Sequence, residues 1–176
     1  MPTSGQSIND WIGVVSKLIS KMMKDFETSF GYPPGENVLL VADRERGAAA
    51  VQALASAGAP RDLLDFYSWV EEVSLPDVGN GIFVHSAQAV IDGVANGQPT
   101  EVVGAVEDTT MVFGSDGGGG LFALNQAGDR VYRLSGGALI GSTYDVDDSG
   151  VQVISNRFWG FLEYVHQELL KVVSLA

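Results

Sequence analysis

The chain has 176 residues, of which 45% are hydrophobic, and this is enough for one domain with a sizeable core. It has no cysteine, which excludes disulfide bonds, thiolate nucleophiles and cysteine metal sites. Its formal net charge is −12, from 22 acidic and 10 basic residues. This charge argues against a nucleic-acid partner, because such binding needs basic residues to displace counterions from phosphates.

The first ten residues, MPTSGQSIND, lack the basic region and apolar core of a signal peptide. No apolar run approaches the roughly 18 residues that a membrane-spanning helix needs. We therefore expect a cytoplasmic protein with no membrane partner.

The first periodic segment predicts an amphipathic helix, because apolar residues recur three and four positions apart. Its apolar stripe comprises Ile8, Trp11, Ile12, Val15, Leu18, Ile19, Met22 and Phe26. Ser7 or Asn9 is suited to cap this helix, and the prolines of GYPPGE end it. We interpret residues 1–35 as an N-terminal helical extension of a single domain, 1–176.

Five further elements are predicted before residue 100. NVLLVAD is a short strand, and the alanine-rich ERGAAAVQALASAG is a helix that ends at Gly58. PRDLLDFYSWVEEV is predicted as another helix, with Leu63, Leu64, Tyr67 and Val70 on one side. IFVHS is a short strand, after which Ser86 is placed to cap a helix through AQAVIDGVANG.

From Glu101 onward, short apolar segments alternate with turn residues about ten residues apart, which is typical of an antiparallel sheet. They are EVVGAV, TMVFG, GLFALN, RVYRL and ALIGSTYDV. NRFWGFLEYVHQELLKVVSL then returns to helical spacing, with an apolar stripe of Phe158, Phe161, Leu162, Val165, Leu169 and Val172.

These elements predict an α+β fold with a sheet of about five to six strands, flanked by helices. The sheet is expected to be antiparallel, with a mixed sheet as the alternative. Its segments lie between Ile82 and Ile154, and we expect helices over 62–70 and at the C-terminus to cover it. Much of its packing should come from Val112, Phe113, Leu121, Phe122, Leu124, Val131 and Tyr132.

The stretch VFGSDGGGGLFALN places four consecutive glycines after Asp116. A P-loop would need Lys and then Ser or Thr after its glycines, and a dinucleotide site would need a helix there. Leu121 and Phe122 follow instead and begin a predicted strand. We therefore interpret the glycines as a turn between strands, with Asp116 in an Asx-type turn and glycine at positive φ. No cofactor is expected.

Several segments together resemble the SUKH superfamily. They are FGSDGGGGLFALN, DRVYRL and NRFWGFLEYV, with APRDLLDFYSWV and GIFVHSAQAV upstream. The resemblance covers about residues 45–173. The chain departs from the family pattern at Ala59–Pro60, where the family has Leu-Pro, and in the helix to about Phe30, which has no counterpart.

The resemblance implies a SUKH-like fold and binding rather than catalysis. Many bacterial SUKH proteins are immunity proteins that neutralise toxins, often nucleases. Other members, including a fungal cell-wall regulator, are interaction modules. Family membership does not identify the partner, since immunity surfaces diversify with their toxins.

Acidic residues are concentrated in one part of this chain, with eleven from Asp62 to Asp129 and no Lys or Arg among them. Together with the resemblance, this predicts a non-catalytic immunity protein that binds a basic toxin domain, such as a nuclease, through an acidic surface. The candidate partner-binding residues are Glu71, Glu72, Asp77, Glu107, Asp108 and Asp116, with Asp145, Asp147 and Asp148 as a second patch. Two alternatives stay open: an acidic surface that only confers solubility, and a SUKH-type regulatory interaction or small-ligand-binding module.

A hydrolase is the catalytic alternative. The chain has two histidines, His85 and His166, and Ser115 or Ser142 could act as a nucleophile with one of them. Neither serine lies in the G-x-S-x-G turn that exposes the nucleophile in many hydrolases. We therefore expect no enzyme.

A cation site has one candidate, the segment DVDDSG. Asp145, Asp147 and Ser149 alternate there and Gly150 is sixth, as at the start of a calcium loop. The twelfth position is Asn156 rather than the bidentate Glu of such loops. We predict an acidic hairpin turn and no metal.

Overall fold

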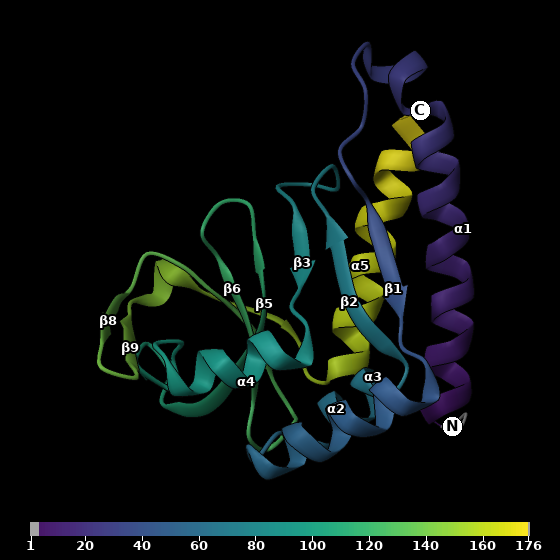
Figure 1. The fold of residues 1–176 in the computed structure, drawn as a ribbon. Coiled ribbons are helices and arrows are strands. Elements are labelled where there is room, and N and C mark those ends of the chain that lie inside the picture. Colours follow the sequence, from purple (N-terminus) through teal and green to yellow (C-terminus); the bar gives the residue numbers. More distant parts are fainter. Residues whose placement is uncertain (1–3, 176) are drawn as a thin grey trace.

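The computed structural model describes residues 4–175, which form five α-helices, one 3-10 turn and ten strands (Figure 1). In chain order these are α1 (Ser4–Phe30), β1 (Val38–Val41), α2 (Arg44–Ser56), α3 (Arg61–Tyr67), β2 (Val70–Leu75), β3 (Ile82–Val84), α4 (Ala87–Ala95), β4 (Glu101–Gly104), β5 (Asp108–Asp116), β6 (Leu121–Asn125), β7 (Val131–Leu134), β8 (Ala138–Ile140), β9 (Thr143–Val146), η1 (Asp148–Gly150), β10 (Val151–Ser155) and α5 (Phe158–Leu175). The predicted α+β class, with helices flanking the sheet, is confirmed.

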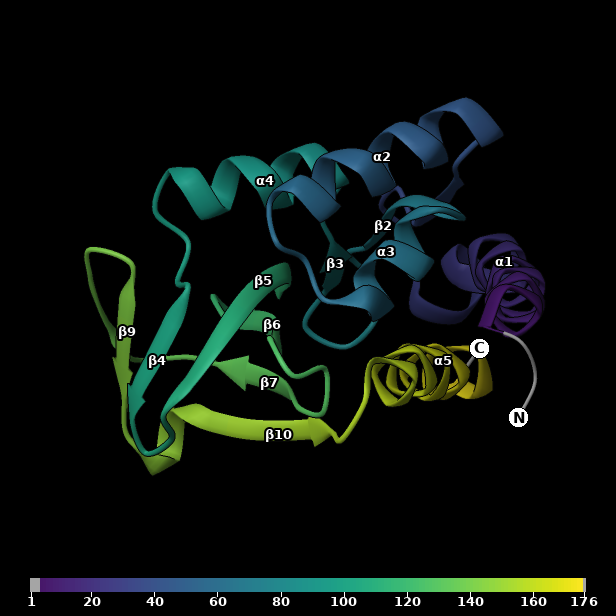
Figure 2. The ribbon, with the colours of Figure 1, turned by 90° about the horizontal axis from the view of Figure 1, so that it is seen from below.

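β5 is the strand at which the sheet branches. Along one edge, its last residues pair with β3, followed by β2 and β1, and its first residues pair with β4, followed by β9 and β8. Its other edge pairs with β6, followed by β7 and β10. Every pairing is antiparallel except β4 with β9, so the sheet is mixed. Strands β4 to β7, β9 and β10 curve around one another at one side of the molecule (Figure 2).

The large core lies between the sheet and the helices. α1 and α5 run side by side over one face of the sheet, where the indole N–H of Trp11 donates to the carbonyl of Leu162 at 2.9 Å (Figures 1 and 2). The predicted stripes of both helices face this core, although Leu18 and Val172 are only partly buried. Phe113, Phe122, Leu124 and Val131 enter it from the strands.

A second, small core fills the curved part of the sheet. It consists of Val102, Val112, Ala123, Tyr132, Leu134, Tyr144 and Val146, with Leu121 partly buried against it. The residues predicted to pack the sheet therefore divide between two cores, because successive side chains along a strand point to opposite faces.

Three details of the predicted elements are wrong. α1 begins at Ser4, so neither Ser7 nor Asn9 is its cap. The helix predicted over 62–70 ends at Tyr67, where the Ser68 hydroxyl donates to the carbonyl of Asp65, and VEEVSL forms β2 instead. The sheet has ten strands rather than five or six, and it extends beyond Ile82–Ile154. The four additional strands are β1, which was predicted as a strand outside the sheet, β2, which was assigned to a helix, β10, which was not predicted, and the second strand of the hairpin that ALIGSTYDV forms.

The interpretation of the glycines as a turn is confirmed, since β5 and β6 flank them and pair with each other. Asp116 Oδ1 accepts hydrogen bonds from the N–H groups of Gly118 at 2.9 Å and Gly120 at 2.8 Å. Gly119 has a φ of +85°, which favours glycine. As for the helices, none within residues 4–175 combines the length and apolar character needed to cross a membrane.

Replacing Gly119 with Val should lower the free energy of unfolding by about 1–3 kcal/mol, because a β-branched residue is strained at positive φ. Gly118 is the matched control, since its φ is not positive and the nearest atom to an added Cβ is Asp116 Oδ1, 3.5 Å away. Urea denaturation should show the larger loss for Gly119→Val. Equal losses at the two positions would contradict the explanation from positive φ. A higher melting temperature with ATP, NAD or phosphate would contradict a purely structural turn.

Candidate functional site

Three chain segments carry carboxylates to one end of the curved sheet. β4 and β9 are parallel, so the segments that follow them leave the sheet together, and the N–H of Ala105 donates to the carbonyl of Val146 at 2.8 Å. The turn between β6 and β7 adjoins them through β5, because the N–H of Gln126 donates to the carbonyl of Thr109 at 2.8 Å. Residues from β4–β5, β6–β7 and β9–η1 therefore meet at the same end.

We call the carboxylates at this end the acidic rim. Its members are Glu107, Asp108, Asp129, Asp145, Asp147 and Asp148. All are exposed except Asp108, which is half-buried. Asp145 lies against the β4 backbone, since a Cβ at Gly104 would be 2.9 Å from its Oδ1. Arg130 is the only basic residue in the segments 105–108, 126–130 and 145–150, so these segments are strongly anionic.

Buried Asn125 holds one side of the rim together. Its side-chain amide donates to Asp108 Oδ2 at 3.0 Å and to Asp129 Oδ1 at 2.7 Å. Its Oδ1 accepts from the backbone N–H groups of Asp129 and Arg130, both at 3.0 Å. Tyr132 also donates to Asp108, at 2.7 Å, and burial and this carboxylate raise the pKa of Tyr132 to about 12. The rim is therefore anchored on ordered side chains rather than carried by a free loop.

The rim unites two of the predicted candidates from the central segment, Glu107 and Asp108, with the whole of the second patch. It also contains Asp129, which was not among the candidates. The sequence AGDR indicates a turn but not that Asp129 belongs to the rim, because its position depends on hydrogen bonds to Asn125.

The structure places the other four predicted residues elsewhere. Glu71 accepts from Arg46 at 3.2 Å, and Glu72 is half-buried on β2. Asp77 accepts from the Asn37 amide at 2.6 Å and from the N–H of Gly35 at 2.7 Å, so it fastens the segment before β1 to the β2–β3 loop. Asp116 lies at the far end of β5 from Asp108, about 25 Å away along a strand of nine residues.

Asp116 has a structural role in its turn. Its side chain is 6% exposed, and its Oδ2 accepts from Arg133 Nε at 2.6 Å. Burial would raise the pKa of Asp116, but hydrogen bonds from the Gly120 N–H, the Arg133 guanidinium and the Gly118 N–H outweigh it and hold that pKa below its usual range.

The structure brings together one of the serine and histidine pairs considered for a hydrolase. His85 Nε2 lies 2.9 Å from Ser115 Oγ across the paired strands β3 and β5. Burial lowers the pKa of His85, and the nearby Glu72 carboxylate opposes this shift. Within residues 4–175 the other ring nitrogen has no hydrogen-bonded carboxylate, so the pair does not form the three-residue relay of serine hydrolases.

The DVDDSG segment is not the hairpin turn that was predicted. It joins β9 to β10, which pair with different strands. Asp147 caps η1 by accepting from the N–H of Ser149 at 3.0 Å and from its hydroxyl, and these bonds, chiefly that from the hydroxyl, lower the pKa of Asp147. Within residues 4–175, no three His, Asp or Glu side chains converge as metal ligands would.

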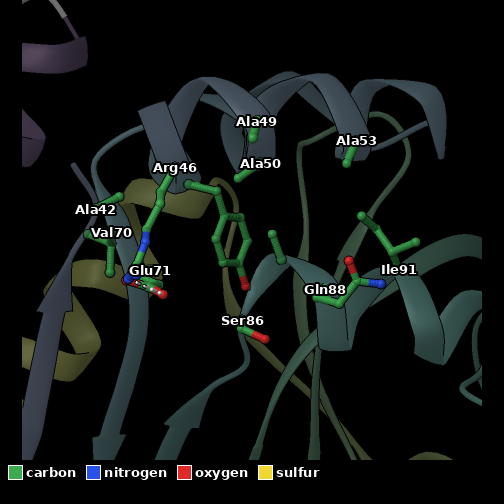
Figure 3. A pocket seen from close by; sticks show the side chains of 12 residues that line it. Ala42, Arg46, Ala49, Ala50, Ala53, Val70, Glu71, Ser86, Gln88 and Ile91 are labelled. Carbon is green, nitrogen blue, oxygen red and sulfur yellow. Dashed lines mark hydrogen bonds and ion pairs between the residues drawn. The ribbon is translucent and has the colours of Figure 1, made fainter. Parts of the chain in front are cut away.

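A pocket of about 450 Å³ lies between α2 and α4, away from the rim (Figure 3). Alanines from α2 and the start of α4 line it, and Ile91 closes one end. The ion pair of Arg46 with Glu71 lies at the other end. The small side chains of the alanine-rich helix leave this space unfilled.

A scan against protein-family models gave no match, and a search of curated proteins gave none either.

Proposed function

We propose that this chain is a SUKH-type immunity protein, which binds and neutralises a basic toxin domain in the cytoplasm without catalysing a reaction. The observation that carries the proposal is the acidic rim, in which three segments distant in sequence present their carboxylates at one end of the sheet. The motif order of the SUKH superfamily, from GIFVHS to FWGFLEYV, supports the same role.

Attraction between the rim and a basic domain would act chiefly on the rate of encounter. Clustered charges of one sign raise association rates by factors of about 10 to 1,000, and salt removes this effect. The anchoring of Asp108 and Asp129 by Asn125 keeps part of the charge pattern fixed before binding, so less order has to be gained in the complex. A nuclease has a basic surface for its substrate, and a rim bound there would exclude that substrate.

Association with the toxin domain that we expect to be encoded beside this gene should slow as salt rises. The screening length falls from about 10 Å at 0.1 M to about 3 Å at 1 M, so rim charges cease to act at a distance. Stopped-flow measurement across this range should show a steep fall in the association rate and a much smaller change in the dissociation rate. An association rate that is independent of salt would contradict binding through the rim.

The pocket between α2 and α4 favours a second candidate function, a small-ligand-binding module. Its alanine lining suits an apolar group, and a ligand carboxylate would have to compete with Glu71 for Arg46. Ala53 lies on the pocket wall, whereas Val90 of α4 packs into the core. A bulky residue at Ala53 therefore fills the pocket without disturbing the core. Ala53→Phe should leave toxin binding unchanged if the rim is the functional surface. If the pocket is the functional site, the same substitution should weaken binding of its small ligand.

A further inference from the structure

Within residues 4–175 the sheet has three strands with only one partner: β1, β8 and β10. Free edges invite pairing with another chain, and β-bulges are one device that prevents it. The β1–β2 ladder shifts register between Leu40 and Val41, and the β10–β7 ladder between Val153 and Ser155. The β8–β9 ladder has no shift. β8 is therefore the regular free edge.

β8 is also unusually apolar for an exposed edge. Its three residues, Ala138, Leu139 and Ile140, are all exposed, with Leu139 at 47% and Ile140 at 71%. It contains neither the lysine nor the proline that commonly protects such an edge. In Figure 1 the β8–β9 hairpin lies at the end of the molecule farthest from α1, where no other element lies along β8.

The backbone of β8 presents hydrogen-bonding groups outward. Ile140 and Thr143 flank the two-residue turn Gly141–Ser142, and Gly141 has the φ of +65° that such hairpin turns require. Residues that flank a two-residue turn form a hydrogen-bonded pair, and pairs alternate along an antiparallel ladder. The N–H and C=O of Leu139 therefore point to the free edge.

We propose that the basic partner adds an extended strand to β8, so that the neutralising interface is a continuation of the sheet. This inference rests on the proposed function and specifies how the partner is held. Backbone hydrogen bonds at Leu139 supply affinity, and the exposed side chains of Leu139 and Ile140 pack against apolar residues of the incoming strand.

The charge near β8 indicates which kind of strand can pair with it. Ala138 pairs with Asp145, and cross-strand neighbours have Cβ atoms about 5 Å apart. The Asp145 carboxylate lies on the same face and leans towards β4. A lysine or arginine of the incoming strand opposite Ala138 would therefore be attracted by it across β8 and β9 without pairing with it directly. A second copy of this chain would instead bring two Asp145 side chains and two rims of like charge together. The edge therefore fits a strand with apolar and basic residues.

The experiment measures binding of the toxin domain to Leu139→Pro, which removes the outward N–H, and to Leu139→Asn, which keeps the backbone. Val153→Asn is the matched control, because Val153 is also 47% exposed on a free edge. We expect dissociation to accelerate about tenfold for Leu139→Pro, the effect of losing a backbone hydrogen bond and its contacts. A smaller acceleration is expected for Leu139→Asn, and none for Val153→Asn.

Melting temperatures identify any variant that fails to fold. If Leu139→Pro does not fold, Leu139→Asn alone tests the proposal. In the wild-type complex, the amide of Leu139 should become protected from hydrogen exchange. If both Leu139 variants bind like wild type while rim charges still control association, strand addition is wrong and the proposed function stands. If the wild-type protein forms no complex, both proposals fail.

Discussion

Replacing Asp116 with Ala should lower the free energy of unfolding by about 2–4 kcal/mol, the largest stability loss expected from a single carboxylate in this fold. The substitution leaves Arg133 without its carboxylate partner and two backbone N–H groups of the glycine turn without their acceptor. The loss is placed below that of a fully buried pair because Arg133 is 27% exposed and keeps access to water.

Asp116→Asn distinguishes the contribution of the charge to stability from that of the hydrogen bonds within the turn. The amide oxygen can still accept from Gly118 and Gly120, so this variant should lose less stability than Asp116→Ala. Urea denaturation of both variants and the wild type measures the difference. If Asp116→Ala is as stable as the wild type, the structural role given to this residue is wrong.

The same residue predicts a pH dependence. The pKa of Asp116 is lower in the folded protein than in the unfolded chain, so the unfolded chain binds its proton first as pH falls. The stabilisation is fully present above the unfolded value near 4 and is lost as pH falls through the lower folded value. In this pH range the unfolding free energy of the wild type should be lower than at pH 7. The unfolding free energy of Asp116→Asn should decrease less over the same range.

Reversing the charge of Glu107, Asp145 and Asp148 to Lys should slow association with the toxin domain at least tenfold at low salt. These rim residues are exposed, and none of the three fixes a buried polar group. The difference from wild type should shrink towards 1 M salt, where the screening length is about 3 Å. Stopped-flow association at several salt concentrations measures both effects.

The matched control reverses three exposed acids of the helical face, Asp10, Glu27 and Glu163, and changes the net charge by the same amount. It should slow association much less, because α1 and α5 carry these residues at the opposite side of the molecule from β8 and β9 (Figure 1). Equal slowing by the two triple variants would mean that net charge, rather than the rim, controls encounter.

The sequence predicted the elements whose spacing is regular over many residues. The apolar stripes of α1 and α5 recur through several turns, so local periodicity was sufficient to identify both helices. Local periodicity failed where the pattern of one short apolar segment fits both a helix and a strand. Val70 and Val73 fit the stripe of α3 as well as the buried face of β2, and only pairing with β1 and β3 distinguishes the two.

The rim was only partly predictable for a related reason. Charge counting located Glu107 and Asp145 as acidic candidates, but their proximity depends on the parallel pairing of β4 with β9, which no local pattern indicates. Composition likewise cannot distinguish a free carboxylate from one engaged internally. Asp77 and Asp116 were candidates by charge, and both hold loops of their own chain.

Co-expression with the toxin domain that we expect to be encoded beside this gene tests the central proposal most directly. Cells that produce the toxin domain should survive when they also produce this protein, and the two proteins should copurify as a complex that the Glu107, Asp145 and Asp148 reversal weakens at low salt. Cells that die despite abundant folded protein, together with purified components that form no complex, would contradict the immunity assignment.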